Sequence, residues 1–277
     1  MRACAAAIAL GRRLLPQRCT LCVASAGGAL LCRACEASLP RLPPSCPVCA
    51  LPSPAAAVCA SCVTRPPPYI ATVAALAYAH PADHLLRQLK YRGRLALAHW
   101  AAAALASAVR ARLEARVPGE YPDRVVALPL ARARQRARGF NQAREIAKRV
   151  ARTLALPLAP ALERVVAGPP QAALPWRERR HNVRGAFAPR GDVRGARLAL
   201  VDDVMTTGAT LAEAALALKQ AGAAQVECWV VARTLPPGGD MSNPARGPSL
   251  LGIKANGASP RPSVASNALR TDRLGAK

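Results

Sequence analysis

Eight of the ten cysteines in this chain fall in four C-x-x-C pairs before residue 63, and this block constrains the fold more than any other feature. The pairs are Cys19/Cys22, Cys32/Cys35, Cys46/Cys49 and Cys59/Cys62. A C-x-x-C turn can direct two thiolates at one tetrahedral ion, and two such turns complete a site with four sulfur ligands. Soft sulfur ligands in closed tetrahedra favour zinc, so the block predicts two structural zinc sites.

The way in which the four pairs combine is open to two interpretations. The first four cysteines recur as the last four with a period of 27 residues (19 to 46), which favours two successive zinc ribbons. An interleaved cross-brace would use the same residues. In either case metal binding would supply stability that a segment this rich in small residues and proline cannot obtain from its own core.

The start of the chain does not fit a secretory signal peptide. Its apolar stretch is short, and Arg12 and Arg13 follow where small residues should mark a cleavage site. No apolar run approaches the ~20 residues of a membrane-spanning helix. We therefore expect a cytoplasmic protein, and its reducing surroundings favour zinc over disulfides as the role of the cysteines.

Beyond a proline-rich linker after Cys62, strand patterns alternate with helical patterns. Strand patterns cover residues 72–78, 123–130, 196–204 and 225–234. Helical patterns cover residues 81–94, 95–115, 143–154 and 210–222, and the arginine-rich stretch 131–142 is interpreted as a loop. Alternation of this kind predicts a parallel sheet with helices on both faces.

A change in composition divides the chain into three parts. Residues 1–65 are expected to form an N-terminal helix and a double zinc ribbon, and residues 66–235 an α/β domain. From residue 236 the sequence is rich in Pro, Gly, Ser and Asn and has no sustained period, so 236–277 is interpreted as a disordered tail.

The net charge of +24 comes mainly from 34 arginines, against five lysines. A charge of this size predicts attraction to a polyanion, either nucleic acid or a phosphorylated small molecule. The alternative is a general enrichment in arginine that only raises solubility. The charge alone does not separate the two.

The segment "LALVDDVMTTGAT" places Asp202 and Asp203 at the end of an apolar strand and opens a loop directly after them. Ligands of parallel sheets bind beyond the carboxyl ends of the strands. Two adjacent buried carboxylates need hydroxyl donors, a cation or both. The loop offers a glycine for close backbone approach, threonine hydroxyls, and the N–H groups of a helix start, which together suit an anion. The candidate phosphate-binding residues are Thr206, Thr207, Gly208, Ala209 and Thr210.

This segment resembles the phosphoribosyl pyrophosphate (PRPP) signature of type I phosphoribosyltransferases. Together with the cysteine block and the segments "LKYRGR", "RARGFNQAREIA" and "PPQAALPWRERRHNVRGAF", it makes the chain similar to the ComF family, named for competence and DNA uptake. The resemblance covers residues 18–234. It implies an α/β fold with a type I phosphoribosyltransferase-like parallel sheet and flanking helices, preceded by a small double zinc-ribbon module. The tail beyond Leu235 departs from the family pattern.

The resemblance also implies roles for particular residues. Asp202 and Asp203 would bind ribose hydroxyls, directly or through Mg²⁺, and residues 206–210 would hold the 5-phosphate. The arginines that would meet the pyrophosphate lie in the stretch after "VVALPL" and are Arg132, Arg134, Arg136 and Arg138. The residues of a loop that would close over the site are Arg179, Arg180 and Asn182.

The implied reaction is displacement of pyrophosphate from C1 of PRPP by a nitrogen nucleophile. Its catalytic residues would be Asp202, Asp203, Arg179 and Arg180, with Mg²⁺ as cofactor besides the two zinc ions. The alternative is a non-catalytic sensor of PRPP or nucleotides that binds single-stranded DNA or DNA-uptake and helicase proteins. In that case "LKYRGR" would contact phosphates and Tyr91 would stack on a base, whereas the simpler interpretation of this stretch is a solvated helix end. No pattern identifies an acceptor base.

Overall fold

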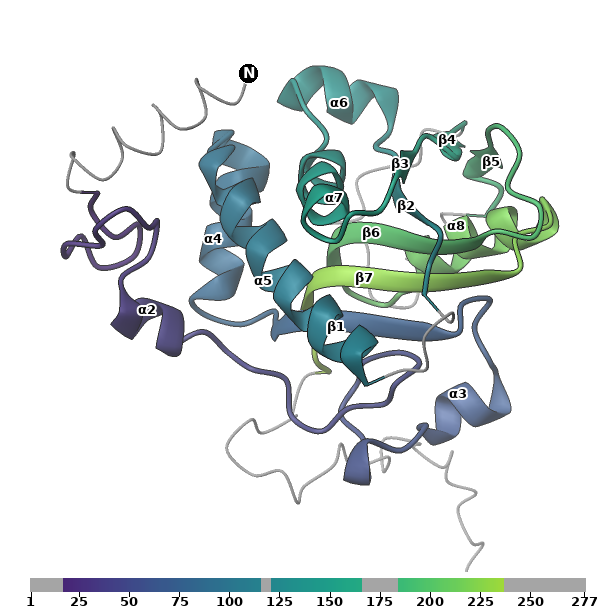
Figure 1. Ribbon diagram of the computed structural model, residues 1–277, viewed down its shortest axis with the longest axis horizontal. Helices are drawn as coiled ribbons and strands as arrows, with labels where there is room; N and C mark the ends of the chain where they lie inside the picture. Colours follow the sequence, from purple (N-terminus) through teal and green to yellow (C-terminus); the bar gives the residue numbers. More distant parts are fainter. Residues whose placement is uncertain (1–16, 116–120, 166–183, 237–277) are drawn as a thin grey trace, which may run out of the picture. The chain divides into compact units, whose positions relative to one another are not determined.

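The computed structural model describes residues 17–115, 121–165 and 184–236, which all belong to one unit of the chain, Met1–Gly247 (Figure 1). The predicted N-terminal helix, which would end near Pro16, and residues 237–277 of the predicted tail lie outside the described residues. Among the helices of the described ranges, none has the length and apolar character needed to cross a membrane. The cytoplasmic location stays a prediction.

Five parallel strands form the central sheet in the order β1-β7-β6-β2-β3. The strands are β1 (Ala71–Ala77), β2 (Arg124–Ala127), β3 (Leu158–Ala159), β6 (Arg197–Met205) and β7 (Gln225–Arg233). The four strand patterns in the sequence correspond to β1, β2, β6 and β7, and the predicted parallel sheet is confirmed. Strand β3 has only two residues, too few to produce a recognisable pattern.

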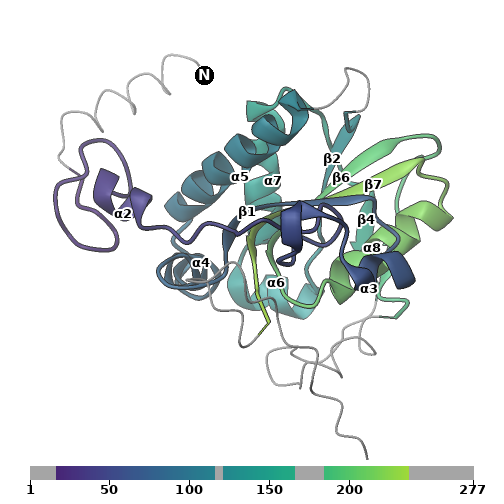
Figure 2. The ribbon, with the colours of Figure 1, turned by 90° about the horizontal axis from the view of Figure 1, so that it is seen from below.

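Helices cover both faces of this sheet, as predicted (Figures 1 and 2). The helices on one face are α4 (Ala82–Arg92), α5 (Ala96–Glu114) and α7 (Gln142–Thr153), and α8 (Ala209–Gln220) lies on the other. Alternate residues of β6 reach opposite faces: Ala199 and Val201 pack with α5 and α7, whereas Leu198 and Leu200 pack with α8. Because both faces are buried, the strands read as continuous apolar runs.

The arginine-rich stretch 131–142 is not the loop that its sequence suggested, because it contains helix α6 (Arg132–Arg138). The stretch has no apolar period from which to recognise a helix. Ala, Arg and Gln nevertheless all have high helix propensity. Gly139 ends the helix in the left-handed region at φ 76°.

Two short strands outside the main sheet, β4 (Leu162–Arg164) and β5 (Phe187–Pro189), pair antiparallel with each other. The sequence analysis did not anticipate this pair. Each strand has three residues, too few to produce a recognisable pattern.

The N-terminal module repeats its backbone as well as its cysteines. The bridge between Arg18 and Ser25 recurs between Ser45 and Pro52, and helix α2 (Arg33–Ala37) recurs as α3 (Ala60–Thr64), each displaced by 27 positions. A short 3₁₀ helix, η1 (Pro54–Ala56), occurs in the second copy. The period seen in the sequence is therefore a structural repeat.

The second half of this module lies along the outer edge of β1, the terminal strand of the sheet. The backbone N–H of Thr72 donates to the carbonyl of Pro47 (3.0 Å), and its hydroxyl donates to the carbonyl of Val48 (2.6 Å). Further along, the N–H of Ala77 donates to Pro40 (2.9 Å). The predicted division of the chain at residue 65 stays a prediction, and these contacts join residues on its two sides.

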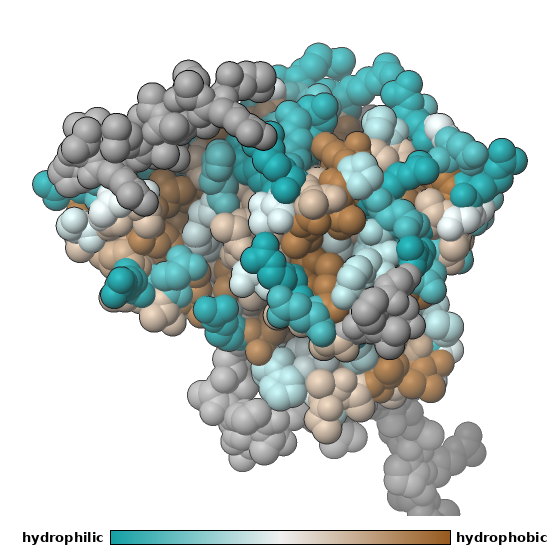
Figure 3. Space-filling model, in the orientation of Figure 1, coloured by the Kyte–Doolittle hydropathy of each residue, from teal (hydrophilic) through white to brown (hydrophobic). Residues whose placement is uncertain are grey.

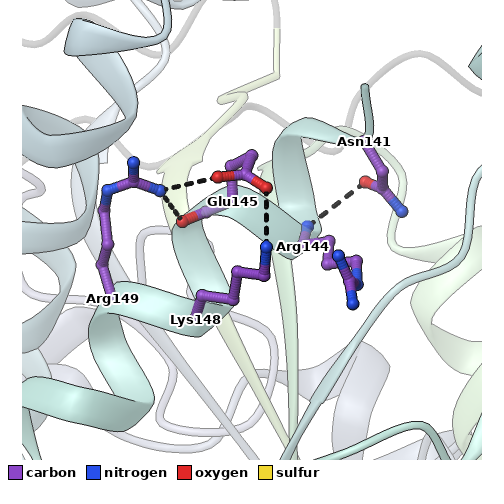
Figure 4. Close-up of polar contacts among 5 residues, drawn as sticks. All are labelled: Asn141, Arg144, Glu145, Lys148 and Arg149. Atoms are coloured by element: carbon purple, nitrogen blue, oxygen red, sulfur yellow. Dashed lines mark hydrogen bonds and ion pairs between the residues drawn. The ribbon is translucent and has the colours of Figure 1, made fainter. Parts of the chain in front are cut away.

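Asn141 connects the start of α7 to the end of β2. Its side-chain oxygen accepts from the N–H of Arg144 (3.3 Å, Figure 4), and its Nδ2 donates to the carbonyl of Leu128 (3.0 Å). The first contact satisfies one of the N–H groups that a helix start leaves without a partner. The second satisfies the carbonyl of Leu128, just after β2, so this residue holds the start of α7 against the end of that strand.

We expect Asn141→Ala to lower the free energy of unfolding by about 2 kcal/mol, because a cap and a buried hydrogen bond are lost together. Urea unfolding measures the change. Asn141→Ser retains the cap acceptor and should cost about half as much. Equal losses in the two variants would show that the cap contributes little.

Candidate functional site

The eight cysteines gather in two groups of four, and the pairing is sequential. The ligand atoms of Cys19, Cys22, Cys32 and Cys35 lie within 4.8 Å of one another, as do those of Cys46, Cys49, Cys59 and Cys62. The interleaved arrangement is therefore ruled out. All eight cysteines that the sequence analysis assigned to metal are used, and the remaining described cysteine, Cys228, is buried in the core.

The geometry of both groups fits a zinc ion. Four sulfurs at about 2.3 Å from a tetrahedral zinc lie roughly 3.8 Å from each other. The Sγ–Sγ distance is 3.6 Å between Cys22 and Cys32 and 3.7 Å between Cys49 and Cys59. The N–H of Cys59 also donates to the sulfur of Cys46 (3.3 Å). The donor set and spacing are those of structural zinc.

The backbone also stabilises thiolates at the first cysteine of each group. Burial raises the pKa of Cys19, but N–H groups of Cys22, Cys32 and Leu21 outweigh it and lower the pKa to about 6. Burial likewise raises the pKa of Cys46, and nearby N–H groups lower it to about 7. Because zinc binds the thiolate, this environment favours the ligand form near neutral pH.

Asp202 and Asp203 lie among the last four residues of β6, at the carboxyl edge of the sheet, where ligands of parallel sheets bind. The alternation of side chains sends them to opposite faces, Asp203 towards α4 and Asp202 towards α8. Asp203 is buried (2% exposed), and Asp202 is half-buried. The Oδ1 atom of Asp202 accepts from the N–H of Asp203 (2.8 Å).

The positive charge beside these carboxylates comes from Lys90 on α4. Its Nζ lies 2.9 Å from Oδ2 of Asp203, and the two side chains are 18% and 3% exposed. Burial lowers the pKa of Lys90, but the charges of Asp203 and Asp202 outweigh burial and raise it. Oδ1 of Asp203 accepts from the N–H of Val204 (2.8 Å). Both oxygens of Asp203 therefore have partners within the chain.

Lys90 is a site residue that the sequence analysis missed. Interpretation of "LKYRGR" as a solvated helix end holds for residues 91–94, which are exposed, but is wrong for Lys90. A signal was present. Lys90 follows Leu86 by four positions, and Leu86 is fully buried, so both side chains lie on the same side of the helix.

The carboxylate of Asp202, unlike that of Asp203, is in surroundings that disfavour its charged form. Burial and the charge of Asp203 raise its pKa well above the usual value, and Lys90 opposes them only in part. Arg164 on β4 is a further nearby cation: burial and Arg134 lower its pKa, whereas Asp202 raises it. The guanidinium of Arg164 also lies 5.5 Å from the ring centroid of Phe187. Arg164 was not among the predicted site residues.

The candidate phosphate-binding residues form the turn between β6 and α8. Gly208 is left-handed at φ 80° and precedes the first residue of α8, Ala209. A Cβ on Gly208 would lie 2.7 Å from Cε of Met205 and 3.3 Å from the hydroxyl oxygen of Tyr69, so Met205 would have to shift, and the positive φ itself favours glycine. The hydroxyl of Thr207 accepts from the N–H of Ala209 (3.2 Å). Thr206, in the turn, and Thr210, the second residue of α8, are partly buried. The predicted loop and helix start are thus brought together with the carboxylates.

The predicted pyrophosphate arginines lie on α6, which follows β2 at the same edge of the sheet. Arg132 and Arg136 line an open depression of about 530 Å³. Arg138 instead stacks 5.2 Å above the ring of Tyr91 and donates to Gln142 (3.1 Å). Figure 3 shows hydrophilic residues gathered along the upper edge of this face, where α6 lies in Figure 1. The other predicted loop residues, Arg179, Arg180 and Asn182, lie outside the described residues.

We expect Lys90→Met to lower the free energy of unfolding by roughly 3 kcal/mol, because it leaves the buried carboxylate of Asp203 without its cation. Urea unfolding at pH 7 measures the loss. Lys148→Met is the matched control. Lys148 forms a more exposed pair with Glu145, which keeps Arg149 as a partner (Figure 4), so the loss should stay near 0.5 kcal/mol. Similar losses in both variants would contradict the inferred charge balance.

We expect Asp202→Asn to raise the melting temperature at pH 7 and to lose this advantage as the pH falls. The folded-state pKa of Asp202 lies above its unfolded value, so Asp202 lowers the stability at high pH, and this cost shrinks as the pH falls below the folded pKa and is gone below the unfolded pKa. Asp123→Asn should change the stability at pH 7 in the opposite direction. Hydrogen bonds from Arg197 lower the pKa of Asp123, so this variant should be less stable at pH 7, with a loss that fades below the usual carboxyl pKa. Thermal unfolding across pH distinguishes the two.

Comparisons with known proteins agree with this arrangement. Residues 10–63 match the family described as a double zinc ribbon domain, and residues 140–244 match the phosphoribosyl transferase domain. The chain is 37% identical over 174 residues to DNA utilization protein YhgH of Escherichia coli K12, which covers 62% of this chain and 75% of that protein. It is 31% identical over 160 residues to Competence protein F of Haemophilus influenzae, covering 56% of this chain and 69% of the relative.

Solved structures of similar topology include a purine phosphoribosyltransferase from Pyrococcus horikoshii (22% identity, TM-score 0.29, 48% of this chain and 70% of that one). Another is TT1426 from Thermus thermophilus (22% identity, TM-score 0.30, 51% and 84%). These scores are low, so the fold assignment rests on the sheet topology and on the family matches. The sequence identity and the coverage of the relatives show that this chain belongs to the ComF family, with a double zinc ribbon followed by a phosphoribosyltransferase-like domain.

Proposed function

We propose that this protein binds PRPP, or a related ribose 5-phosphate, at the carboxyl end of β6 and transfers the phosphoribosyl group to a nitrogen acceptor. One observation carries the proposal. The chain brings Asp202 and Asp203 to the sheet edge shortly before a turn whose left-handed Gly208 precedes the start of α8. Carboxylates suit sugar hydroxyls, and a helix start with nearby threonine hydroxyls suits a phosphate.

Each part of the ligand then has a matching part of the site. Asp202 and Asp203 would accept hydrogen bonds from the ribose hydroxyls, with Lys90 balancing the charge of Asp203. Residues 206–210 would bind the 5-phosphate. Arg136, which lines the depression on α6, and Arg138 are candidates for the pyrophosphate. Arginine suits this group because its guanidinium is always charged and can bind two oxygens at once.

In the proposed reaction a bond forms between the acceptor nitrogen and C1 of the ribose while the bond from C1 to pyrophosphate breaks. The electron pair of that bond leaves with the pyrophosphate, and the acceptor nitrogen loses its proton. Positive charge develops on the sugar, so negative carboxylates near the ribose and cationic arginines at the leaving group lower the barrier. Arg179 and Arg180 belong to this proposal on sequence grounds alone.

The oxygens of Asp203 are poorly placed to hold a resident Mg²⁺ ion. Mg²⁺ requires oxygen ligands in near-octahedral geometry, but the oxygens of Asp203 already face Lys90 and the N–H of Val204. We therefore propose that Mg²⁺ arrives with the pyrophosphate as part of the substrate, rather than as a cofactor held by the two aspartates.

The names of the relatives support a role in DNA handling. They are DNA utilization and competence proteins, and we propose that this chain takes part in the use or uptake of DNA. A second candidate function is a non-catalytic sensor that binds single-stranded DNA. The observation that favours it is Tyr91, which is 66% exposed beneath the guanidinium of Arg138 and so presents an aromatic face next to a cation.

We expect calorimetry to detect PRPP binding that strengthens with Mg²⁺ and is lost in the double variant Asp202→Asn/Asp203→Asn. The matched control is Asp192→Asn, an exposed acid paired with Arg194, which should bind as the wild type does. Unchanged binding in the double variant would remove the site assignment.

Pyrophosphate release, assayed with a panel of nitrogenous bases, then separates the two functions. Turnover with any base supports transfer. PRPP binding without turnover, together with single-stranded DNA binding that falls steeply with salt, supports the sensor.

A further inference from the structure

Arg233, the last residue of β7, is a fully buried cation that connects the second zinc ribbon to the phosphate-binding turn. Its side chain is 2% exposed. Nε donates to the carbonyl of Cys49, a zinc ligand (2.8 Å). Nη1 donates to the carbonyl of Met205 (2.9 Å) and also to that of Thr206, where β6 passes into the turn. One side chain therefore joins two segments that are far apart in the sequence.

The partners of Arg233 among the described residues are carbonyl oxygens, including that of Thr234 (3.1 Å). Carbonyl dipoles alone compensate a buried charge incompletely. Cys49 and Cys62, two ligands of the second zinc site, lie close enough for their charges to act on the guanidinium of Arg233. Four thiolates outweigh the charge of one zinc ion, so a metal-loaded second ribbon places net negative charge beside this guanidinium.

Holding the two carbonyls orients the N–H groups of the turn. The peptide bond is planar and trans, so its carbonyl and N–H point in opposite directions. When Arg233 holds the carbonyls of Met205 and Thr206, the N–H groups of Thr206 and Thr207 are directed away from Arg233. These N–H groups belong to the turn that we assign to the 5-phosphate.

The surroundings leave little room for the turn to move while the second ribbon is in place. Tyr69 and Met205 are buried in the same core cluster, with Val48 of the second ribbon packed against it. Tyr69 and Met205 also lie against Gly208, so the turn packs directly on this cluster. The first ribbon contacts a different region, through the hydrogen bond from Trp100 on α5 to Glu36 (3.3 Å).

We propose that Arg233 is a positioning residue through which the second zinc site, and not the first, sets the conformation of the phosphate-binding turn. With zinc bound, the ribbon holds Arg233 and Arg233 holds the turn in its binding conformation. Without that zinc, the turn loosens and phosphate binding weakens. The part of this inference that concerns ligand affinity rests on the proposed function.

The repeat supplies a matched pair of variants for the test. Cys62 and Cys35 occupy the same position in the two copies, so Cys62→Ser and Cys35→Ser each disable one zinc site. The full-length proteins are compared by zinc content, by hydrogen exchange of the segment 205–210, and by calorimetry with Mg²⁺ and PRPP. We expect Cys62→Ser to speed exchange in this segment and to weaken PRPP binding at least tenfold. Cys35→Ser should stay within twofold of the wild type in both readouts.

Arg233→Met tests the connection directly. It should reproduce the faster exchange and weaker binding of Cys62→Ser, and combining both changes should add little, because they break the same connection. Arg233→Lys, which keeps the charge, should give an intermediate result. Thr72→Val removes another hydrogen bond to the same ribbon and should leave the exchange of 205–210 unchanged. These variants also cover the case in which Cys62→Ser does not fold.

Two results would overturn the inference: unchanged exchange of 205–210 in Cys62→Ser and Arg233→Met, or an equal change in Cys35→Ser. Because hydrogen exchange needs no ligand, failure of the proposed function is recognised separately. If the wild type does not bind PRPP but the variants show the expected exchange pattern, the link from the second zinc site through Arg233 to the turn is supported and PRPP as the ligand is refuted.

Discussion

The need to balance a negative charge buried at the end of the central strand determines much of the structure around the candidate site. Asp203 is almost inaccessible to solvent, and an isolated carboxylate in such a position would cost several kcal/mol. Lys90 supplies the cation. To do so, α4 must run along the sheet with its polar end at the carboxyl edge, and the leucines of its inner face must remain buried. A charge requirement at the site thus helps to set the position of a helix in the core.

The same sheet edge contains a second buried cation whose partners are different. Lys90 neutralises the carboxylate of Asp203. Arg233 instead binds main-chain carbonyls, those of Met205 at the end of β6 and of Cys49 in the second ribbon. The difference suits the two side chains. Lysine acts as a point charge, and the planar guanidinium of arginine can bind several acceptors in fixed directions. Lys90 therefore balances the charge of Asp203 at the carboxyl edge of the sheet, and Arg233 binds the main-chain carbonyls of Met205 and Thr206.

Much of this arrangement was predictable from local patterns, and the remainder depended on contacts between distant segments. The cysteine period identified both zinc sites, and apolar runs located the four longer strands of the sheet. The "DDVMTTGAT" segment located the turn before α8. The sequence offered no comparable pattern for α6, whose helix arises from propensity without amphipathic spacing, or for β3, β4 and β5, which have two or three residues each. The ion pair from Lys90 to Asp203 and the bonds of Arg233 to Cys49 and Met205 join residues more than 20 positions apart in the chain. Such pairs follow from the packing of the folded chain and leave no periodic trace.

The hydrogen bonds from β1 to the zinc-ribbon segment have a consequence for how this protein is made. An unprotected terminal strand can pair with a strand of another molecule and start aggregation. At the opposite end of the sheet β3 has only two residues and offers little to pair with, but β1 has seven. The eight zinc-binding cysteines leave the ribosome before β1 does, because they precede it in the sequence. A nascent chain that binds zinc early therefore folds the zinc ribbon that covers the edge of β1 before that strand is synthesised. In cells starved of zinc we expect this protein to accumulate in insoluble form.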